Sequence, residues 1–261
     1  MRNAAAFRNK LSGGDVAFGT GVSFTDPTVT EALCAILDFV WIDMEHGPLS
    51  LPVVQGHLLA TRGSQTAGLV RVAWNDPVLI KPVLDMGADG IIVPMVRTPA
   101  EARQAVEACK YPPEGIRGFG PRRASDYARR GGPEFCSEAN EEVLTFVQVE
   151  HADAVASLDQ IVSTPGLSGI ALGPNDLAAS MGHTGQPSHP DVTAAIETTV
   201  AQAREAGLMV GIGSGHTAEE LLQWIRMGVQ WFTMGCDFSL LTSAAEQSIR
   251  ATRERLESEP R

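Results

Sequence analysis

Short apolar segments recur along the whole chain. Each is rich in Val, Ile, Leu or Phe, is bounded by Gly, Pro or Asp, and is continuously apolar, not alternating. This pattern is typical of strands that are buried on both faces, as in a parallel sheet covered by helices. We count eight such segments, at residues 16–22, 39–44, 68–72, 90–95, 144–150, 169–173, 208–213 and 231–235.

Segments with a helical period lie between these strands. The clearest are residues 99–109, 191–206 and 218–227. Gly207 and Gly228 follow two of them, where a left-handed cap is common. Pro99 and Pro190 stand at helix starts, where a missing N–H costs nothing. Eight strand–helix units in 261 residues predict one α/β domain over residues 1–261, a (β/α)8 barrel.

The main alternative is a doubly wound open sheet. Such a sheet usually has fewer strands and a glycine-rich phosphate-binding turn after the first one. Residues 19–24 read Gly-Thr-Gly-Val-Ser-Phe, without the third glycine or an acidic residue at the expected distance. We therefore reject a dinucleotide-binding fold. One connection, residues 109–142, is long and rich in Gly, Pro and Arg, and connections of that length are usually functional or mobile.

Composition excludes several other classes of protein. A formal net charge of -11 argues against a nucleic-acid partner, which needs a basic surface. The four cysteines are scattered and form no CxxC motif, so we expect no zinc ribbon or disulfide framework. No window approaches the roughly 18 apolar residues of a membrane span, and no signal peptide is evident. We expect a cytoplasmic protein with no membrane partner.

Acidic residues follow two neighbouring strands of the predicted barrel. The carboxyl ends of barrel strands meet at one mouth, where active sites lie. Glu150 and Asp176 would come together there. Two carboxylates without a thiol or a histidine cluster suit a hard divalent cation such as Mg²⁺ or Mn²⁺. The alternative is that each acid only begins a helix, and position alone leaves both interpretations open.

Three further residues at the predicted mouth offer proton transfer and anion binding. Asp43 lies three residues before His46, close enough for its carboxylate to orient the imidazole as a general base. The alternative is a histidine hydrogen-bonded in a tight turn. Arg71 ends an apolar run, where a guanidinium is costly unless it meets an anion. That anion could be a substrate or, in an internal salt bridge, Asp43, Glu45 or Glu150.

Other ionisable groups give weaker signals. Residues 110–135 hold six basic residues against three acidic ones, an excess that could steer an anionic substrate, although such loops are more often only solvated. Among the remaining histidines, His216 is the one that could reach the mouth. The others are assigned to structural or surface roles: His57, His151, His183 and His189.

Six stretches of the sequence match the motifs of one enzyme family: DFVWIDMEHGPL (38–49), VRVAWNDPV (70–78), LDMGADGIIVPMVR (84–97), YPPEGIRGFGPR (111–122), VQVEH (147–151) and LGPNDLAASMGHTGQPSHPD (172–191). Through them the chain resembles the HpcH/HpaI aldolase family of metal-dependent class II pyruvate aldolases, such as 4-hydroxy-2-oxoheptanedioate aldolase and 2-dehydro-3-deoxyglucarate aldolase. The resemblance implies a barrel of the phosphoenolpyruvate/pyruvate type. It also implies a homohexamer, a trimer of dimers, in which a helix at about residues 239–256 is exchanged between subunits, although that segment could also cap its own barrel.

The same resemblance implies how metal and substrate are bound. Glu150 and Asp176 would be the protein ligands of a divalent metal, Mg²⁺, Mn²⁺ or Co²⁺. Pyruvate would chelate this metal through its keto and carboxylate oxygens. Backbone amides would hold the substrate carboxylate. The amides lie around Gly173, Pro174 and Asn175.

Roles in the reaction are also implied by the resemblance. Arg71 would bind the keto oxygen and stabilise the enolate, and Gln148 would line the same pocket. His46, oriented by Asp43, would activate a metal-bound water for proton transfer. The implied reaction is the reversible aldol cleavage of a 4-hydroxy-2-oxo acid to pyruvate, or a close analogue, and an aldehyde. The partners are therefore small molecules.

The lysines favour the metal-dependent route independently of the resemblance. A Schiff-base mechanism would need a desolvated lysine at the mouth, and none of Lys10, Lys81 and Lys110 ends a predicted strand. The alternatives are an oxaloacetate decarboxylase, a citrate-lyase-like CoA-ester lyase or a non-catalytic 2-oxo acid binder. Residues 18–20 and 211–215 are less bulky than in many family members, which predicts a wider aldehyde end.

Overall fold

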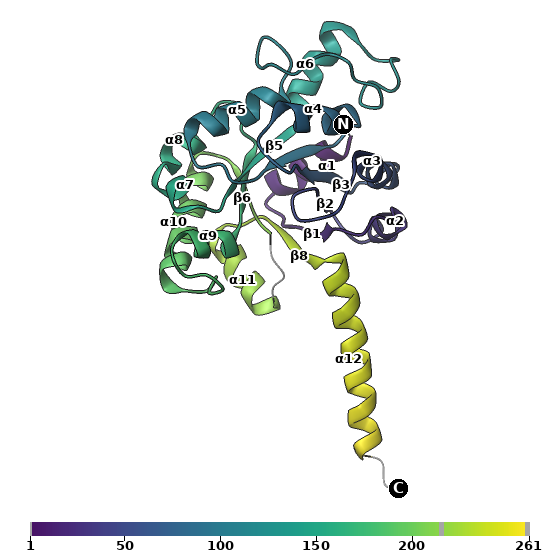
Figure 1. The fold of residues 1–261 in the computed structure, drawn as a ribbon, viewed down its shortest axis with the longest axis vertical. Coiled ribbons are helices and arrows are strands. Elements are labelled where there is room, and N and C mark those ends of the chain that lie inside the picture. The colour runs from purple at the N-terminus through teal and green to yellow at the C-terminus, as the bar shows by residue number, and fades with distance from the viewer. Residues whose placement is uncertain (1, 214–216, 259–261) are drawn as a thin grey trace.

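The computed structural model describes residues 2–213 and 217–258. Its parallel strands close into a barrel in which each strand pairs with the next and the last pairs with the first (Figure 1). The predicted (β/α)8 barrel is therefore confirmed. The strands are β1 (Ala17–Val22), β2 (Phe39–Asp43), β3 (Ala67–Arg71), β4 (Gly90–Val93), β5 (Leu144–Val149), β6 (Gly169–Leu172), β7 (Met209–Ile212) and β8 (Trp231–Cys236).

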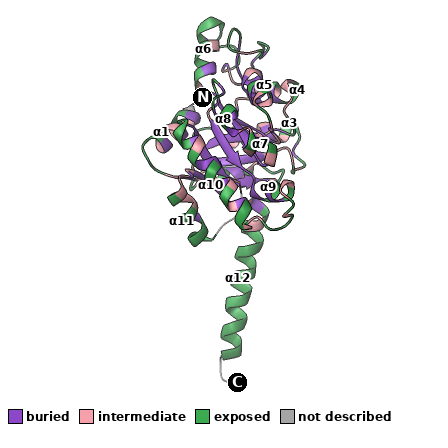
Figure 2. Ribbon diagram, turned by 90° about the vertical axis from the view of Figure 1, so that its left-hand side faces the viewer, coloured by how far each residue is buried: buried purple, intermediate pink, exposed green. Residues whose placement is uncertain are grey.

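Helices surround the barrel, with their exposed faces outward and the buried strands at the centre (Figure 2). Two of the expected helices have the predicted bounds, α5 (Pro99–Cys109) and α11 (Ala218–Met227), and α10 (Pro190–Glu205) is shifted by one residue. The others are α1 (Arg2–Ser12), α2 (Thr28–Leu33), α3 (Leu51–Ala60), α4 (Pro77–Asp85), α6 (Gly132–Glu142), α7 (Ala152–Ala156), α8 (Leu158–Val162), α9 (Pro174–Ser180) and α12 (Asp237–Ser258).

Aromatic side chains fill the barrel from its amino-terminal end. Phe7 of α1 closes this end, with its ring centroid 5.6–6.5 Å from those of Phe39, Phe146 and Trp231. Gly211 provides the space that the indole needs, because a Cβ there would lie 1.9 Å from the Trp231 ring. The interior of the barrel at this end is therefore a packed aromatic core.

The alternation of side chains along each strand carries polar residues to the other end. Trp41, Leu69 and Phe146 belong to the interior cluster. Residues two positions further along a strand face the same side. Strands β2, β3 and β5 therefore present an acidic, a basic and an amide side chain at the carboxyl-terminal mouth: Asp43, Arg71 and Gln148.

The long connection lies at the end opposite the mouth, because it leads from helix α5 back to the start of strand β5. It contains α6, a helix that the sequence pattern did not reveal. Arg117 is fully buried and pairs with Asp85 at 2.9 Å, and Arg123 donates to carbonyl oxygens at the ends of α3 and α4. The basic groups of this loop thus support the base of the barrel, and they do not lie beside the mouth of their own chain.

Helix α12 leaves the barrel after β8 and projects away from it (Figures 1 and 2). Beyond Leu240 every described residue of this helix is exposed, including Leu241, Ile249 and Leu256. The helix therefore does not cap its own barrel, which removes one of its two predicted positions. None of the described helices combines the length and apolar composition that a membrane crossing requires.

Candidate active site

A cavity of about 400 Å³ opens at the carboxyl-terminal end of the barrel. Four of the predicted site residues line it together: Asp43, His46, Arg71 and Gln148. Apolar residues, among them Trp41 and Phe238, form much of the remaining wall. The mouth thus combines a few polar groups with an apolar lining, as small-molecule sites usually do.

Arg71 is held by two carboxylates. Its Nε and Nη2 donate to the two oxygens of Asp43 at 2.9 and 2.6 Å, and Nη1 lies 2.9 Å from Oε2 of Glu45. The register of β2 and β3 pairs Asp43 directly with Arg71. Three of the five guanidinium N–H groups are therefore engaged by carboxylates, and the side chain still lines the cavity. The internal salt bridge that the sequence left open is confirmed.

The two carboxylates that hold Arg71 differ in how readily they ionise. Burial works against ionisation of Asp43, but the hydrogen bond and charge of Arg71 outweigh it, so the pKa of Asp43 lies below its usual value. Glu45 shows the opposite balance, because burial raises its pKa in spite of Arg71. Arg71 thus favours the ionised form of Asp43, and Asp43 in turn fixes the guanidinium.

The relation between Asp43 and His46 differs from the prediction. The Asp43 carboxylate accepts hydrogen bonds from the backbone N–H groups of Glu45 and His46, at 3.0 and 3.3 Å. Among the described residues it does not contact the imidazole of His46. Nε2 of His46 lies instead 3.9 Å from Oε2 of Glu45, with most of the ring exposed. Asp43 therefore shapes the turn that carries His46, and its direct partner is Arg71.

Glu150 is 2% exposed and lies next to Gln148. Its Oε1 accepts the Met95 N–H at 2.6 Å, and its Oε2 accepts Nε2 of Gln148 at 2.6 Å. Burial raises the pKa of Glu150 to about 7; the Met95 amide opposes this, and the charges of Glu45 and Asp176 add to it. A second buried acceptor, Oε1 of Gln148, has no hydrogen-bond partner among the described residues.

Asp176 lies in the first turn of α9 and is exposed. Its charge acts on both Glu45 and Glu150, raising the pKa of each. Gly173 precedes the helix, and a Cβ there would lie 2.6 Å from Oε2 of Glu150, so only glycine allows this approach. Glu45, Glu150 and Asp176 thus form a set of mutually repelling carboxylates at the mouth.

The predicted amide donors are only partly available. The Gly173 N–H already donates to the Val149 carbonyl at 3.3 Å, and Pro174 has no N–H. Asn175 and Asp176 follow in the first turn of α9, where N–H groups have no partner within the helix. An anion at this position would therefore meet the amides of Asn175 and Asp176.

The predicted widening of the aldehyde end needs correction. Strand β1 extends to Val22, so Gly19 lies inside the barrel, where a Cβ would be 2.5 Å from the Phe39 carbonyl oxygen. Gly211 likewise only makes room for Trp231. Gly213 does line the cavity. Residues 214–216, including His216, lie outside the described residues.

Residue type alone did not reveal two groups of this site. Glu45 was considered only as an ion-pair partner, yet it contacts Arg71 and lies nearest to the His46 ring. Met95 contributes its backbone N–H and has a left-handed φ of 55°. Such a backbone conformation is costly for a side chain other than glycine, and it clusters at functional sites.

Fold and site together define a (β/α)8-barrel enzyme with an arginine and several carboxylates at its mouth. The family model described as HpcH/HpaI aldolase/citrate lyase matches residues 22–244. The chain belongs to this family.

Two curated relatives and one solved structure support the assignment. The 4-hydroxy-2-oxo-heptane-1,7-dioate aldolase of Klebsiella pneumoniae is 39% identical over 243 residues, 92% of this chain and 91% of that protein. The hydroxypyruvate/pyruvate aldolase of Roseovarius nubinhibens is 38% identical over 248 residues, 93% of this chain and 95% of that protein. An HpcH/HpaI aldolase/citrate lyase family protein from Burkholderia cenocepacia superimposes with a TM-score of 0.90 at 34% identity, covering 96% of this chain and 99% of that one.

Proposed function

We propose that this protein is a divalent-metal-dependent aldolase that reversibly cleaves a 4-hydroxy-2-oxo acid into pyruvate, or a close analogue, and an aldehyde. The observation that carries the proposal is the mouth itself, where Arg71 lines the cavity beside a set of buried and partly buried carboxylates. The names of the two curated relatives, both aldolases of 2-oxo acids, support the same reaction.

The residues at the mouth fit a hard divalent cation held by Glu150 and Asp176. Each oxygen of Glu150 accepts one hydrogen bond and keeps a further lone pair. The negative charges of Glu45 and Asp176 disfavour ionisation of Glu150, so a cation here would relieve repulsion. Oxygen donors match Mg²⁺ or Mn²⁺, and Co²⁺ is also compatible. When bound, the cation would stabilise the negative charge that develops on the oxygens of the 2-oxo acid.

Arg71 would stabilise that charge from the other side. Aldol cleavage leaves the electron pair of the broken C3–C4 bond on the pyruvate fragment, as an enolate. A guanidinium already fixed by Asp43 and Glu45 needs little reorganisation to bind the enolate oxygen, which is the condition for effective electrostatic stabilisation. The Gln148 amide lines the same cavity and would orient the substrate. The amides of Asn175 and Asp176 would hold the substrate carboxylate.

His46 would move the proton. Cleavage requires the C4 hydroxyl to lose its proton, and His46 places an imidazole, the side chain that most often transfers protons in enzymes, on the cavity wall. Its backbone is anchored by Asp43 and its ring lies nearest to Glu45. In cleavage the imidazole would accept the hydroxyl proton, and in condensation it would return it.

The reaction is tested by measuring pyruvate released from 4-hydroxy-2-oxo acids of different chain length. Chelator-stripped protein should be inactive, and Mg²⁺ or Mn²⁺ should restore pyruvate release. Replacing Arg71 with Ala should nearly abolish turnover. Metal loaded onto folded protein with no pyruvate released would reject the aldolase, and oxaloacetate and CoA esters would then test the decarboxylase and lyase alternatives.

We also propose that α12 packs against another copy of the chain in a homohexamer, a trimer of dimers. The helix exposes Phe238, Leu241, Ile249 and Leu256 and contacts its own barrel only near its start. A chain truncated after residue 239 should form assemblies with fewer subunits, as measured by light scattering. The free cysteines fit a reducing compartment, and we propose a cytoplasmic location.

A further inference from the structure

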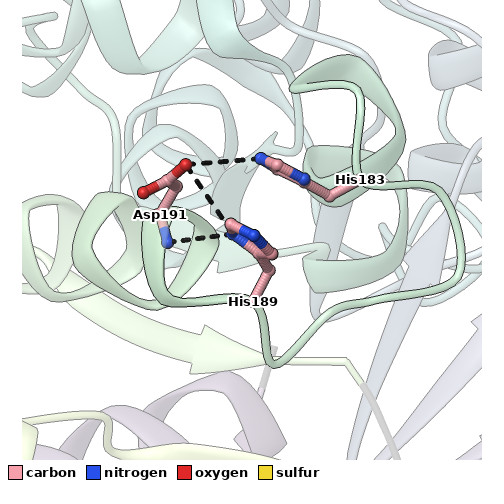
Figure 3. Close-up of side chains that lie close together, drawn as sticks. All are labelled: His183, His189 and Asp191. Carbon is pink, nitrogen blue, oxygen red and sulfur yellow. Dashed lines mark hydrogen bonds and ion pairs between the residues drawn. The ribbon is translucent and has the colours of Figure 1, made fainter.

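A second group of metal-ligating side chains lies in the connection between α9 and α10. Within residues 2–213 and 217–258, His183, His189 and Asp191 form a group in which each residue offers a ligand atom within 4.8 Å of the others (Figure 3). The sequence pattern assigned both histidines to surface or structural roles, because neither has the spacing of a metal ligand with a partner. The turn brings them together, with ring centroids 3.6 Å apart and an interplanar angle of 12°.

Backbone hydrogen bonds hold the loop that carries these side chains without help from a ligand. Gly182, at a left-handed φ of 84°, ends α9, and the His183 N–H then donates back to the Ala178 carbonyl at 2.7 Å. Two further bonds close the loop, from the Gln186 N–H to the His183 carbonyl at 2.9 Å and from the His189 N–H to the Gln186 carbonyl at 3.0 Å. The backbone of the loop would therefore lose little conformational freedom when a metal ion binds, which favours affinity.

The distances suit a small transition-metal ion. Oδ2 of Asp191 lies 3.4 Å from Nε2 of His183 and 3.7 Å from Nδ1 of His189. In a tetrahedral zinc site with bonds of about 2.0–2.1 Å, ligand atoms are about 3.3–3.4 Å apart. The two distances from Asp191 are close to that spacing, and the stacked imidazole rings would tilt so that the lone pairs in their planes converge on one ion. Two imidazoles and one carboxylate form a nitrogen-rich set that prefers zinc to the hard cations.

We propose that His183, His189 and Asp191 bind Zn²⁺ at a site separate from the catalytic mouth. The ion joins the end of α9 to the start of α10, and the exposure of the Asp191 side chain leaves further positions to water. At His189 the metal replaces a weak capping bond, because Nδ1 now accepts the Asp191 N–H at 3.2 Å. The two sites would therefore prefer different metals: the oxygen ligands at the mouth suit hard divalent cations, and the mainly nitrogen ligands in the loop suit zinc.

The same chain contains a matched site without the second imidazole. His151 caps α7 as His189 caps α10, with Nδ1 accepting the Asp153 N–H at 3.1 Å and lying 3.3 Å from its Oδ2. A histidine followed two residues later by an aspartate is therefore a capping arrangement by itself. The addition of His183 distinguishes the loop group, so Asp153→Asn is a fitting control for Asp191→Asn.

Zinc binding is measured on the full, chelator-stripped chain by competition with a chromophoric chelator, with Mg²⁺ present to occupy the mouth. His183→Gln and Asp191→Asn should each bind one zinc ion fewer per chain than wild type, or bind it at least about tenfold more weakly. They should also lose the rise in Tm that zinc gives to wild type. Asp153→Asn should behave as wild type in both measurements.

A second measurement locates the ion. In Asp176→Ala protein, whose mouth site is impaired, X-ray absorption at the zinc edge should show imidazole scattering from two histidines. Equal zinc stoichiometry and equal Tm shifts in wild type and all three variants would overturn the proposal, as would zinc without imidazole ligands. Circular dichroism checks folding, and Asp191→Asn alters an exposed side chain, so it decides the matter if His183→Gln does not fold.

Discussion

Two carboxylates are buried at opposite ends of the same barrel, and their neighbours differ. Asp89, just before β4 at the amino-terminal end, is 6% exposed and accepts the N–H groups of Ala4 and Gly68 at 3.1 and 3.0 Å. Glu150, just after β5 at the mouth, is 2% exposed and accepts one backbone N–H and one side-chain amide. Burial is similar, so the surrounding charge makes the difference.

The pKa values of the two groups show what each end provides. Burial raises the pKa of Asp89 to about 6, and the two amides and nearby positive charges oppose the rise. Burial raises the pKa of Glu150 to about 7, and other carboxylates, Glu45 and Asp176, push it higher. Asp89 is thus compensated within the chain and ties α1 to the barrel. Under the proposed function, a bound cation would balance the charge of Glu150.

Cavity size does not follow the difference in charge between the two ends of the barrel. A cavity of about 650 Å³ lies at the amino-terminal end, lined in part by α1, and is larger than the cavity of about 400 Å³ at the mouth. Among the described residues that line this larger cavity, Asp15 is the one acid, so they form no carboxylate cluster. The arrangement of charges, and not the amount of space, distinguishes the end that we propose to be catalytic.

The largest expected effect is on catalysis at the mouth. Glu150→Gln keeps the shape of the side chain and removes its charge, so metal-dependent pyruvate release should fall by about 10²- to 10³-fold or more. The metal-free variant should be no less stable than wild type, because a buried charge has been removed. Steady-state kinetics and urea unfolding check both results. A Glu150→Gln enzyme with near-normal kcat would place the metal elsewhere.

The second largest effect is expected on the pH dependence of stability, to which the two carboxylates should contribute over different pH ranges. Both pKa values are raised above the unfolded values of 4.5 for Glu150 and 3.8 for Asp89. The protonated form of each carboxyl group therefore contributes to the free energy of unfolding. This contribution is complete below the unfolded pKa and is lost as pH rises through about 6 for Asp89 and about 7 for Glu150. Each loss is on the order of 3 kcal/mol.

This dependence is measured as the free energy of unfolding of metal-free protein between pH 4 and 8. Glu150→Gln should remove the part of the fall that continues to about pH 7, and Asp89→Asn the part that ends near pH 6. Identical pH profiles for wild type and Glu150→Gln would contradict the buried charge at the mouth.

A smaller effect is expected at the amino-terminal end. Asp89→Asn replaces one acceptor with an NH₂ group that faces a backbone N–H, at a cost of about 1–3 kcal/mol. Removal of the buried charge opposes this cost, so the free energy of unfolding at pH 7 should change by no more than about 1 kcal/mol. The folded variant should keep the wild-type kcat, since Asp89 lies at the far end of the barrel. A large loss of kcat with unchanged stability would reverse the roles of the two carboxylates.

Much of this fold follows from the sequence because burial on both faces leaves continuous apolar runs. Each predicted strand is present, and the proline and glycine signals at α5 and α11 gave the observed bounds. The position of the long connection was also implied, since a segment leading from a helix to a strand must lie at the amino-terminal end. The steering role suggested for its charges ignored that constraint.

The partners of site residues were harder to predict because spacing along the chain favours local pairs. His46 is three residues from Asp43, yet strand register pairs Asp43 with Arg71, 28 residues away. Met95 acts through its backbone, which its residue type does not indicate. His183 and His189 meet because two turns between them, closed by hydrogen bonds to the His183 and Gln186 carbonyls, reverse the chain. Each of these contacts depends on tertiary geometry.

The central claim is that Glu150 and Asp176 hold the cation, and Mn²⁺ binding followed by electron paramagnetic resonance tests it most directly. Wild-type protein and Asp89→Asn should bind Mn²⁺ alike, and so should His183→Gln, whose nitrogen-rich loop does not suit this ion. Glu150→Gln and Asp176→Ala should both lose most of the binding. Undiminished Mn²⁺ binding in folded Glu150→Gln and Asp176→Ala proteins would contradict the account.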